Sequence, residues 1–388
     1  MKLALIGYGQ AGGKIVDEFV RYDEEVGGGF VNAAIAVNTA TADLRGIEHV
    51  DEDDRVLIGQ SRVKGHGVGA DNDLGAAVTE ADIDEIQAAI DRVPVHDLDA
   101  FLIVAGLGGG TGSGGAPVLA THLKRLYTEP VYGLGVLPGT DEGGIYTLNA
   151  ARSFQTFVRE VDNLLVFDND AWRRTGESVG AGFDRTNREI VERFGLLFAA
   201  GEVDDTGAVA ESVVDSSEII NTLSGGGVSS IGYATEAVDR GDDGLLSRLT
   251  RSDDGDHAIS STNRMASVIR KATLGRLTLP CEPSSADRAL VVASGPPAAL
   301  NRKGIERGRS WLEEETGSME VRGGDYPRLG TDRVGSIVLL SGVTDVPRIE
   351  QLQEVAVEAK HTTATIEANS QDGFETLVDT GGELDALF

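Results

Sequence analysis

A glycine-rich segment in the first third of the chain constrains the fold more than any other feature. The hydrophobic run Phe101–Val104 leads into it, and seven glycines lie between Gly106 and Gly115, with Thr111 and Ser113 among them. A tight turn from a strand into a helix needs only one or two glycines. Successive glycines with interleaved hydroxyl side chains instead offer many unhindered N–H and O–H donors to a polyphosphate. The segment therefore predicts a phosphate-binding loop between a buried strand and a helix.

A second glycine loop follows the first predicted strand. Gly7, Gly9 and Gly12 have the G-x-G-x-x-G spacing that lets backbone N–H groups approach a phosphate, and a helix is expected to begin near Gly13. A Rossmann-type oxidoreductase would also need an acidic residue at the end of the second strand, but that strand ends in Asn38. Only this first loop favours the oxidoreductase alternative, and Asn38 argues against it.

The first two hundred residues alternate apolar strand-like runs with helical periods, which is typical of a parallel sheet wrapped by helices. A long helix is predicted from about Arg185 to near Gly201, and after Gly225 the chain mixes strands with helices. We predict an α/β fold: a Rossmann-like parallel-sheet domain (residues 1–184), a central helix and loop (185–224) and an α+β domain (225–388). The predicted strands are Lys2–Gly7, Ala33–Asn38, Arg55–Gly59, Ala100–Ala105, Tyr132–Leu137, Asn163–Asp168, Ala289–Ala293, Ser336–Leu340 and Thr363–Ala368, and the later helices are Ala258–Thr273, Ala299–Glu315 and Pro347–Lys360.

The charge of the chain limits which partners and which environment can be expected. Its 63 acidic and 34 basic residues give a formal net charge of −29, and the acids are scattered along the chain, which argues against a nucleic-acid partner. Seven lysines stand beside 27 arginines. That bias suits a surface kept hydrated in concentrated salt, where self-repulsion is screened. We therefore expect a protein of a halophilic cytoplasm.

Several site classes are disfavoured by simple counts. No run approaches the roughly 18 apolar residues that cross a bilayer, so no transmembrane segment is predicted. Cys281 is the single cysteine, which excludes an internal disulfide and predicts a small buried apolar side chain. The histidines show no i, i+4 pair, so no metal site built by the protein alone is predicted.

The glycine segment also carries a family resemblance. Gly108–Gly114 reproduces the GGGTG[ST]G signature of tubulin and FtsZ, and Ala105–Pro117 resembles FtsZ in particular. The resemblance implies a cytoskeletal GTPase that binds GTP or GDP, with Mg2+ held through the phosphates, and that polymerises head to tail with its own copies. Gln10 after Gly9, the acidic surface low in lysine and the absence of a basic-hydrophobic tail resemble the archaeal CetZ proteins, which implies a role in cell shape.

The same resemblance implies roles for individual residues. Arg62–Asp73 would flank the γ-phosphate, Glu142 and Asn169 would hold the ribose, and Asn187 would bind guanine. Each of the last three also has a structural alternative, as a helix cap, a turn residue and an exposed helical residue respectively. The predicted nucleotide-binding residues are Gln10, Ala11, Gly12, Gly13, Lys14, Asn38, Gly108, Gly109, Gly110, Thr111, Gly112, Ser113, Glu142, Asn169 and Asn187.

The resemblance places the catalytic acids in the loop after the long helix. Asp215 and Glu218 would complete the nucleotide site of the adjacent subunit, so that hydrolysis depends on assembly. Their spacing is also that of an N-cap and its capping-box partner at the start of a helix reaching Leu223. Val213 stands where FtsZ usually has asparagine, and Glu218 stands for its usual aspartate.

Two further functions stay open from the sequence. Val213 and Glu218 leave room for a GTP-binding regulator or scaffold that does not hydrolyse the nucleotide, and the FtsZ likeness leaves room for a cell-division protein. The expected partner is another copy of the chain. The sequence identifies no membrane-associated partner.

Overall fold

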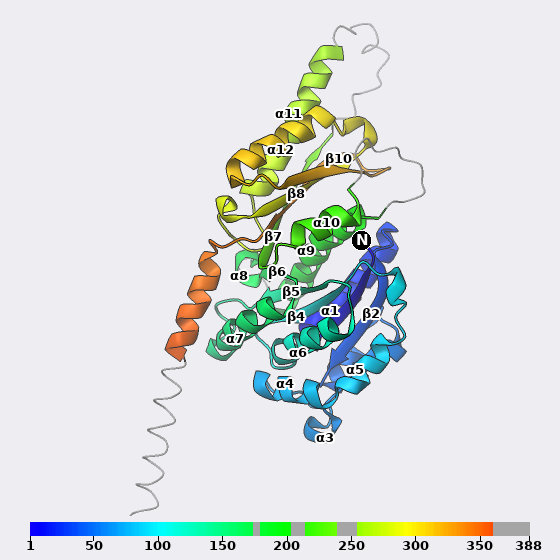
Figure 1. Cartoon of the computed structure of the whole chain (residues 1–388), viewed down its shortest axis with the longest axis vertical. Coiled ribbons are helices and arrows are strands. Elements are labelled where there is room, and N and C mark those ends of the chain that lie inside the picture. The colour runs from blue at the N-terminus through cyan, green and yellow to red at the C-terminus, as the bar shows by residue number, and fades with distance from the viewer. Residues whose placement is uncertain (174–178, 203–213, 239–253, 360–388) are drawn as a thin grey trace, which may run out of the picture.

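The computed structural model of the 388-residue chain describes residues 1–173, 179–202, 214–238 and 254–359. Within them, one 10-stranded sheet runs through the molecule in the order β3-β2-β1-β4-β5-β6-β7-β10-β8-β9 (Figure 1). The strands are β1 Leu3–Tyr8, β2 Val31–Asn38, β3 Arg55–Leu57, β4 Ala100–Gly106, β5 Val131–Leu137, β6 Asn163–Asp168, β7 Val228–Ala237, β8 Arg288–Gly295, β9 Val321–Pro327 and β10 Arg333–Ser341.

Helices cover the sheet, and most of them connect successive strands of its parallel half. One further helix, over residues 347–359, follows the last strand and is drawn in orange in Figure 1. The others are α1 Gly9–Val26, α2 Thr41–Arg45, α3 Gln60–Val63, α4 Asn72–Ala81, α5 Ile83–Ile90, α6 Thr111–Leu126, α7 Gly144–Glu160, α8 Asn169–Trp172, α9 Val179–Ala200, α10 Ser216–Leu223, α11 Asp254–Leu274 and α12 Arg302–Thr316.

The first six strands pair in parallel, and β1, β5 and β6 are buried along their whole length. Burial of this kind is expected where helices cover both faces of a parallel sheet. The predicted α/β class is therefore confirmed for this half, and each of its six predicted strands is found with small shifts at the ends. The strand predicted over Arg55–Gly59 is shorter, since β3 ends at Leu57.

The second half of the sheet is mixed. β10 pairs antiparallel with both β7 and β8, whereas β8 and β9 are parallel. The helices α11 and α12 pack together beside these strands (Figure 1), which confirms the predicted α+β character. β7 and β9 were not predicted, because small polar residues and glycines such as Ser229, Gly232 and Gly323 interrupt their apolar pattern. The predicted strand Thr363–Ala368 lies outside the described residues.

The long helix α9 joins the two halves. It begins at Val179 instead of near Arg185, and Ile190, Phe194 and Phe198 are buried on its inner side as their spacing predicts. The sheet continues from β6 into β7 through a short parallel pairing that starts at Leu164. The domain boundaries after residues 184 and 224 stay predictions.

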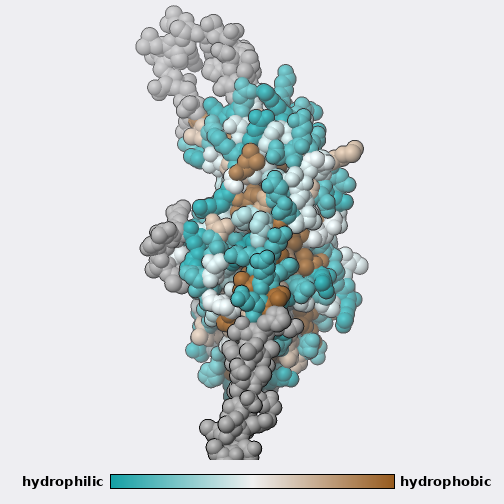
Figure 2. Space-filling view, turned by 90° about the vertical axis from the view of Figure 1, so that its left-hand side faces the viewer, coloured by the Kyte–Doolittle hydropathy of each residue, from teal (hydrophilic) through white to brown (hydrophobic). Residues whose placement is uncertain are grey.

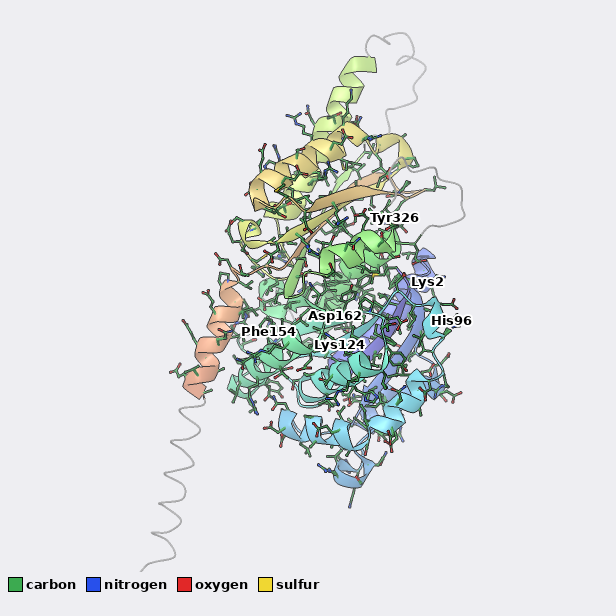
Figure 3. The ribbon with its side chains drawn as sticks, viewed as in Figure 1. Lys2, His96, Lys124, Phe154, Asp162 and Tyr326 are labelled. Atoms are coloured by element: carbon green, nitrogen blue, oxygen red, sulfur yellow. The ribbon has the colours of Figure 1, made fainter. Side chains whose placement is uncertain are left out.

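The helix after the glycine segment is tied to the sheet at its far end. Lys124 in the last turn of α6 pairs with Asp162, just before β6, at 2.8 Å (Figure 3). The other carboxylate oxygen of Asp162 accepts a hydrogen bond from the backbone N–H of Val131 at 2.8 Å. These contacts, together with the buried apolar face of α6, fix the direction in which its first turn faces.

Apolar residues do not gather into one large patch on the visible surface. In the face shown in Figure 2, hydrophilic residues predominate and the hydrophobic ones are scattered, as the composition predicts. No helix in the described part of the chain has the length and apolarity to cross a membrane.

Candidate functional site

The two glycine loops meet at the carboxyl ends of β1 and β4. These strands are parallel neighbours, with Tyr8 opposite Ala105, so both loops leave the sheet at the same edge. Gly9 has a φ of +73°, and a Cβ there would lie 2.8 Å from the backbone nitrogen of Gly112. A Cβ on Gly112 would lie 2.8 Å from the carbonyl oxygen of Tyr8. Glycine is therefore required here because the two backbones touch.

Each loop runs directly into a helix. α1 begins at Gly9 and α6 at Thr111, and in neither helix does a side chain cap the first turn. The first N–H groups of a helix lack partners within the helix, and its N-terminus carries a partial positive charge. Two such N-termini at one edge of a sheet form an anion-binding site.

The loops line a cavity of about 590 Å³, a volume within the range of small-molecule sites. No lysine or arginine of the described residues lines it. A bound polyphosphate would therefore be held by backbone N–H groups and helix dipoles. The predicted residues that line the cavity are Gln10, Ala11, Asn38, Gly108, Gly109, Gly110, Thr111, Gly112, Glu142, Asn169 and Asn187.

The structure does not place Gly12, Gly13, Lys14 or Ser113 on the cavity lining. Gly12 is required by packing, since a Cβ there would lie 2.0 Å from the carbonyl oxygen of Val104. The hydroxyl of Ser113 donates back to the carbonyls of the glycine segment and braces it from behind. The nucleotide contacts assigned to these four residues stay predictions.

A polar network fixes the loop after β2. Asn38 is 3% exposed, its Oδ1 accepts from the backbone N–H of Thr39 at 2.7 Å, and its Nδ2 donates to Asp43 at 3.2 Å. Gln10 donates to the other carboxylate oxygen of Asp43, also at 3.2 Å. The hydroxyls of Thr39 and Thr111 lie 2.7 Å apart, so this loop is tied to both glycine loops.

A residue of α7, Asn149, also holds the glycine segment in place, and this contact was not predicted from the sequence. Asn149 is 2% exposed, and its Nδ2 donates to the carbonyls of Ala70, at 2.7 Å, and Gly108, at 3.1 Å. It thus joins the glycine segment to the loop of residues 65–70, which forms another wall of the cavity. That wall belongs to the predicted Arg62–Asp73 stretch.

The far end of the cavity holds the three residues predicted for ribose and base. Glu142 does not cap α7; its carboxylate accepts from the backbone N–H of Gly139 at 2.7 Å and shapes its own loop. The Oδ1 of Asn169 is buried and has no hydrogen-bond partner among the described residues. An unpaired buried acceptor costs about 1–3 kcal/mol, so a ligand N–H or O–H donor would be stabilising there.

Two aromatic side chains at this end were missed from the sequence. Tyr146 and Phe183 line the cavity and are 37% and 44% exposed. Phe183 and Asn187 lie four residues apart on α9, so they share one face of the helix. An exposed ring beside an amide suits a planar base, which could stack on one and hydrogen-bond to the other. The i, i+4 spacing was the available signal, but the predicted helix began after Phe183.

The predicted catalytic acids lie far from this cavity. Ile219 of α10 packs beside Gly201 and Met1, near the amino end of β1, and α10 lies next to the N-terminus in Figure 1. The cavity is at the carboxyl end of the same strand. Six residues of extended strand span roughly 20 Å, so Asp215 and Glu218 lie at the opposite edge of the sheet.

Asp215 is the N-cap of α10. Its carboxylate accepts from the backbone N–H of Glu218 at 3.1 Å and from the Ser217 hydroxyl at 2.5 Å, and these bonds, the hydroxyl first, lower the pKa of Asp215. Glu218 makes a different contact from that of a capping box, because its carboxylate lies 3.3 Å from the guanidinium of Arg322 in β9. Both acids are accessible to solvent, so capping does not prevent contact with a second molecule. Val213 lies outside the described residues.

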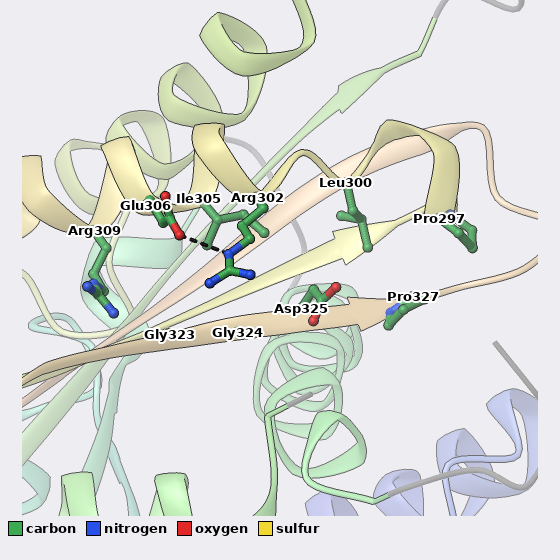
Figure 4. A pocket seen from close by; sticks show the side chains of 10 residues that line it. All are labelled: Pro297, Leu300, Arg302, Ile305, Glu306, Arg309, Gly323, Gly324, Asp325 and Pro327. Atoms are coloured by element: carbon green, nitrogen blue, oxygen red, sulfur yellow. Dashed lines mark hydrogen bonds and ion pairs between the residues drawn. The ribbon is translucent and has the colours of Figure 1, made fainter. Parts of the chain in front are cut away.

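A smaller cavity of about 230 Å³ lies between α12 and β9, in the other half of the sheet (Figure 4). Arg302 and Glu306 pair with each other at its side, at 2.9 Å. It shares no lining residue with the cavity at the glycine loops.

Comparisons with known proteins agree with this geometry. The family model of the tubulin/FtsZ GTPase domain matches residues 2–177, and that of the C-terminal domain of tubulin-like CetZ matches residues 176–358. CetZ1 of Haloferax volcanii is 70% identical over 93% of both chains, and CetZ3 of the same organism is 61% identical over 100% of both.

Solved structures of related proteins share the fold. The GDP-bound monomer of Haloferax volcanii CetZ1 has a TM-score of 0.83 and 66% identity, and the match covers 93% of this chain and 100% of that one. The GTPγS-bound protofilament of CetZ2 from the same organism has a TM-score of 0.83 and 47% identity, with 94% and 100% covered.

Proposed function

The chain belongs to the CetZ family of tubulin-like proteins, and on that premise we propose that it binds GTP and hydrolyses it within a head-to-tail polymer of its own copies. One observation carries the proposal. The anion-binding glycine loops lie at one edge of the sheet, and the acids Asp215 and Glu218 lie at the opposite edge. Copies stacked head to tail bring these two edges together, so each junction completes one site.

The nucleotide would lie along the cavity with its phosphates at the glycine loops. Its ribose would reach Glu142 and Asn169. The Oδ1 of Asn169, which has no partner among the described residues, would accept a hydrogen bond from a ribose hydroxyl. Its base would stack near Phe183 and hydrogen-bond to Asn187. An asparagine can pair with either purine, so guanine is proposed from the family and from the GDP and GTPγS of the related structures.

Mg2+ would be held mainly by the phosphate oxygens. The described residues contain no group of three or more His, Cys, Asp or Glu side chains that could hold a metal ion. Among the residues that line the cavity, Asp43 and Glu142 carry carboxylates and Thr111 carries a hydroxyl. The bound ion would neutralise phosphate charge, which no lysine or arginine of the described lining does.

Hydrolysis would need a water molecule held in line with the γ-phosphorus. The water oxygen bonds to that phosphorus, and the bond to the bridging oxygen breaks with its electron pair staying on GDP. The protons of the water leave with the released phosphate as H2PO4−. The carboxylate of Asp215 is ionised at neutral pH, as for an ordinary aspartate, and its hydrogen bonds lower its pKa further. It can therefore accept a hydrogen bond from the attacking water of the neighbouring subunit. Arg322 would hold the carboxylate of Glu218 beside it.

A second function is supported by one contact. Because Glu218 pairs with Arg322, it is less free to approach a neighbouring nucleotide, which favours a GTP-binding regulator or scaffold that does not hydrolyse GTP. The test is GTP hydrolysis in high salt with Mg2+, measured as activity per molecule against protein concentration. Activity that rises steeply with concentration supports the shared site, and a flat dependence contradicts it. Tight GTP binding without turnover would establish the regulator.

In the cell, we propose cytoplasmic filaments that control cell shape, with an FtsZ-like role in division as the alternative. This proposal rests on membership of the CetZ family. Imaging of a strain that lacks the protein separates the two. Altered shape with normal septa supports the first role, and filamentous cells with failed septa support the second.

A further inference from the structure

A buried arginine connects the last described helix to the nucleotide end of the molecule. Arg348, at the start of the helix over residues 347–359, is 8% exposed. Its guanidinium donates to the carbonyl of Pro138 at 2.8 Å, to Asp168 at 3.3 Å and to Gln351 at 2.9 Å. Asp168 is 3% exposed, so a buried carboxylate balances the buried cation.

Two of these acceptors lie at the bases of the loops that face the proposed nucleoside. Pro138 begins the loop that reaches Glu142 and itself lines the cavity, and Asp168 directly precedes Asn169. Arg348 does not line the cavity. Any effect that it has on a ligand must therefore pass through these two loops.

The two loops are also bonded to each other. Asp168 accepts from the backbone N–H of Asp170 at 3.1 Å, which caps α8. The carboxylate of Asp170 then accepts from the backbone N–H of Thr140, at 3.0 Å, and from its hydroxyl, at 2.8 Å. Arg348 thus contacts both sides of a closed network, and a shift of its guanidinium would move both loops.

We propose that Arg348 is a positioning residue that sets the affinity of the ribose and base end of the cavity from the C-terminal helix. The inference rests on the proposed binding of guanine nucleotides. Arg348 donates its hydrogen bonds to Asp168, Gln351 and Pro138 and not to the glycine loops that would hold the phosphates, so it acts directly on the nucleoside end.

Loss of the cation would disturb this network in a specific way. Burial raises the pKa of Asp168, and the charge of Arg348 acts against that rise. Without Arg348 the carboxylate would take up a proton more readily, and it would accept the hydrogen bond that caps α8 less strongly. Because coupling is reciprocal, bound nucleotide should in turn hold the helix over residues 347–359 more firmly.

The test is calorimetric titration of the full-length protein with GDP and with 2′-deoxy-GDP, below the concentration at which it assembles. Arg348→Met should weaken GDP binding about tenfold, a size typical of indirect coupling. It should also reduce the preference for GDP over 2′-deoxy-GDP, because Glu142 and Asn169 would no longer be placed against the ribose. Arg348→Lys keeps the charge without the planar fork and should give an intermediate result.

Leu352→Ala is the matched control. Leu352 is 1% exposed on the same helix and packs in the core, so its truncation loosens the helix, and its apolar side chain takes no part in the hydrogen bonds that join the two loops. It should lower the melting temperature but leave the preference for the ribose hydroxyl unchanged.

Three outcomes would overturn the inference. Folded Arg348→Met with the GDP affinity and ribose preference of the wild type would do so, as would an equal loss of preference in Leu352→Ala. If Arg348→Met does not fold, Asp168→Asn replaces it in the same comparison. Wild-type protein that binds neither nucleotide would overturn the proposed function itself, and the positioning role with it.

Discussion

Ser153 of α7 donates its hydroxyl hydrogen to the carbonyl oxygen of Ser113 at 2.7 Å. In a regular helix that carbonyl would accept from the N–H of residue 117, but α6 has a proline there. Ser153 is 3% exposed, so it supplies a buried substitute for the missing donor. This contact explains how a proline can stand beyond the first turn of the helix on which the proposed phosphate site depends.

Replacing Ser153 by alanine should leave the carbonyl of Ser113 buried without a donor. The cost of such a group is about 1–3 kcal/mol of unfolding free energy. Urea unfolding in high salt measures it. Thr156→Ala is the control, because Thr156 lies on the next turn of α7 and is exposed, and its hydroxyl only returns to the carbonyl of Arg152. Equal stability of Ser153→Ala and the wild type would contradict this account of the proline.

Replacing Asn169 should weaken nucleotide binding without lowering the stability of the protein. Its Oδ1 is buried without a partner in the described part of the chain, so Asn169→Ala removes an unsatisfied group as well as a proposed ligand contact. We expect GTP to bind about tenfold more weakly, or roughly 1.4 kcal/mol, while unfolding free energy stays the same or rises. Titration with GTP and thermal unfolding of the free protein measure the two effects. A large loss of stability would show that the side chain serves the fold.

Much of the parallel half could be predicted from the sequence because its signals are local. An apolar run followed by glycines marks a buried strand and a phosphate loop, as in Phe101–Val104 before Gly108–Gly114, and the same signature gave the family, which the comparisons confirm. Residues that brace the loops are different. Asn149 is one polar residue within an ordinary helical period, and only the folded chain shows that its amide joins two loops about 40 and 80 residues away, at Gly108 and Ala70.

Long-range pairings account for the other omissions. Arg348 and Asp168 are separated by 180 residues, and no spacing rule connects them. β9 could not be predicted because Gly323 and Gly324 break its apolar alternation, and its strand character comes from pairing with β8. For Asp215 and Glu218 a local spacing predicted two local contacts, and only one of them is found. Their spacing predicted a cap correctly for Asp215, but the partner of Glu218 is Arg322, which lies 104 residues further along the chain.

Cys281 is half-buried and not fully buried as predicted, and it should still react slowly with alkylating reagents. Burial raises the pKa of its thiol to about 12, so very little thiolate is present at pH 8. Since the thiolate is the reactive form, we expect alkylation roughly a thousandfold slower than for a free cysteine, and a rate that keeps rising with pH through pH 10. Mass spectrometry of iodoacetamide adducts in the native protein and in urea measures both. A native rate close to that in urea would contradict the burial argument.

The two roles of Asp215 can be separated by two substitutions. Serine is as good an N-cap as aspartate but has no carboxylate, whereas alanine removes both functions. Asp215→Ser should therefore keep the stability of the wild type, and Asp215→Ala should lose about 1 kcal/mol of unfolding free energy. If the carboxylate positions the attacking water of the neighbouring subunit, both variants should bind GTP normally and lose roughly a hundredfold or more of their assembly-dependent turnover.

Phosphate release at several protein concentrations, beside urea unfolding, distinguishes these effects. Mixing each variant with wild-type protein adds a sharper test, because the acid and the nucleotide would come from different subunits. A variant subunit can still assemble and supply an intact cavity, so wild-type protein held below its own assembly concentration should gain turnover when the variant is added. Once all subunits are assembled, turnover should be proportional to the number of wild-type acids, because each junction needs one. Asp215→Ser with full turnover would show that the residue is a cap and that the water is oriented by another group.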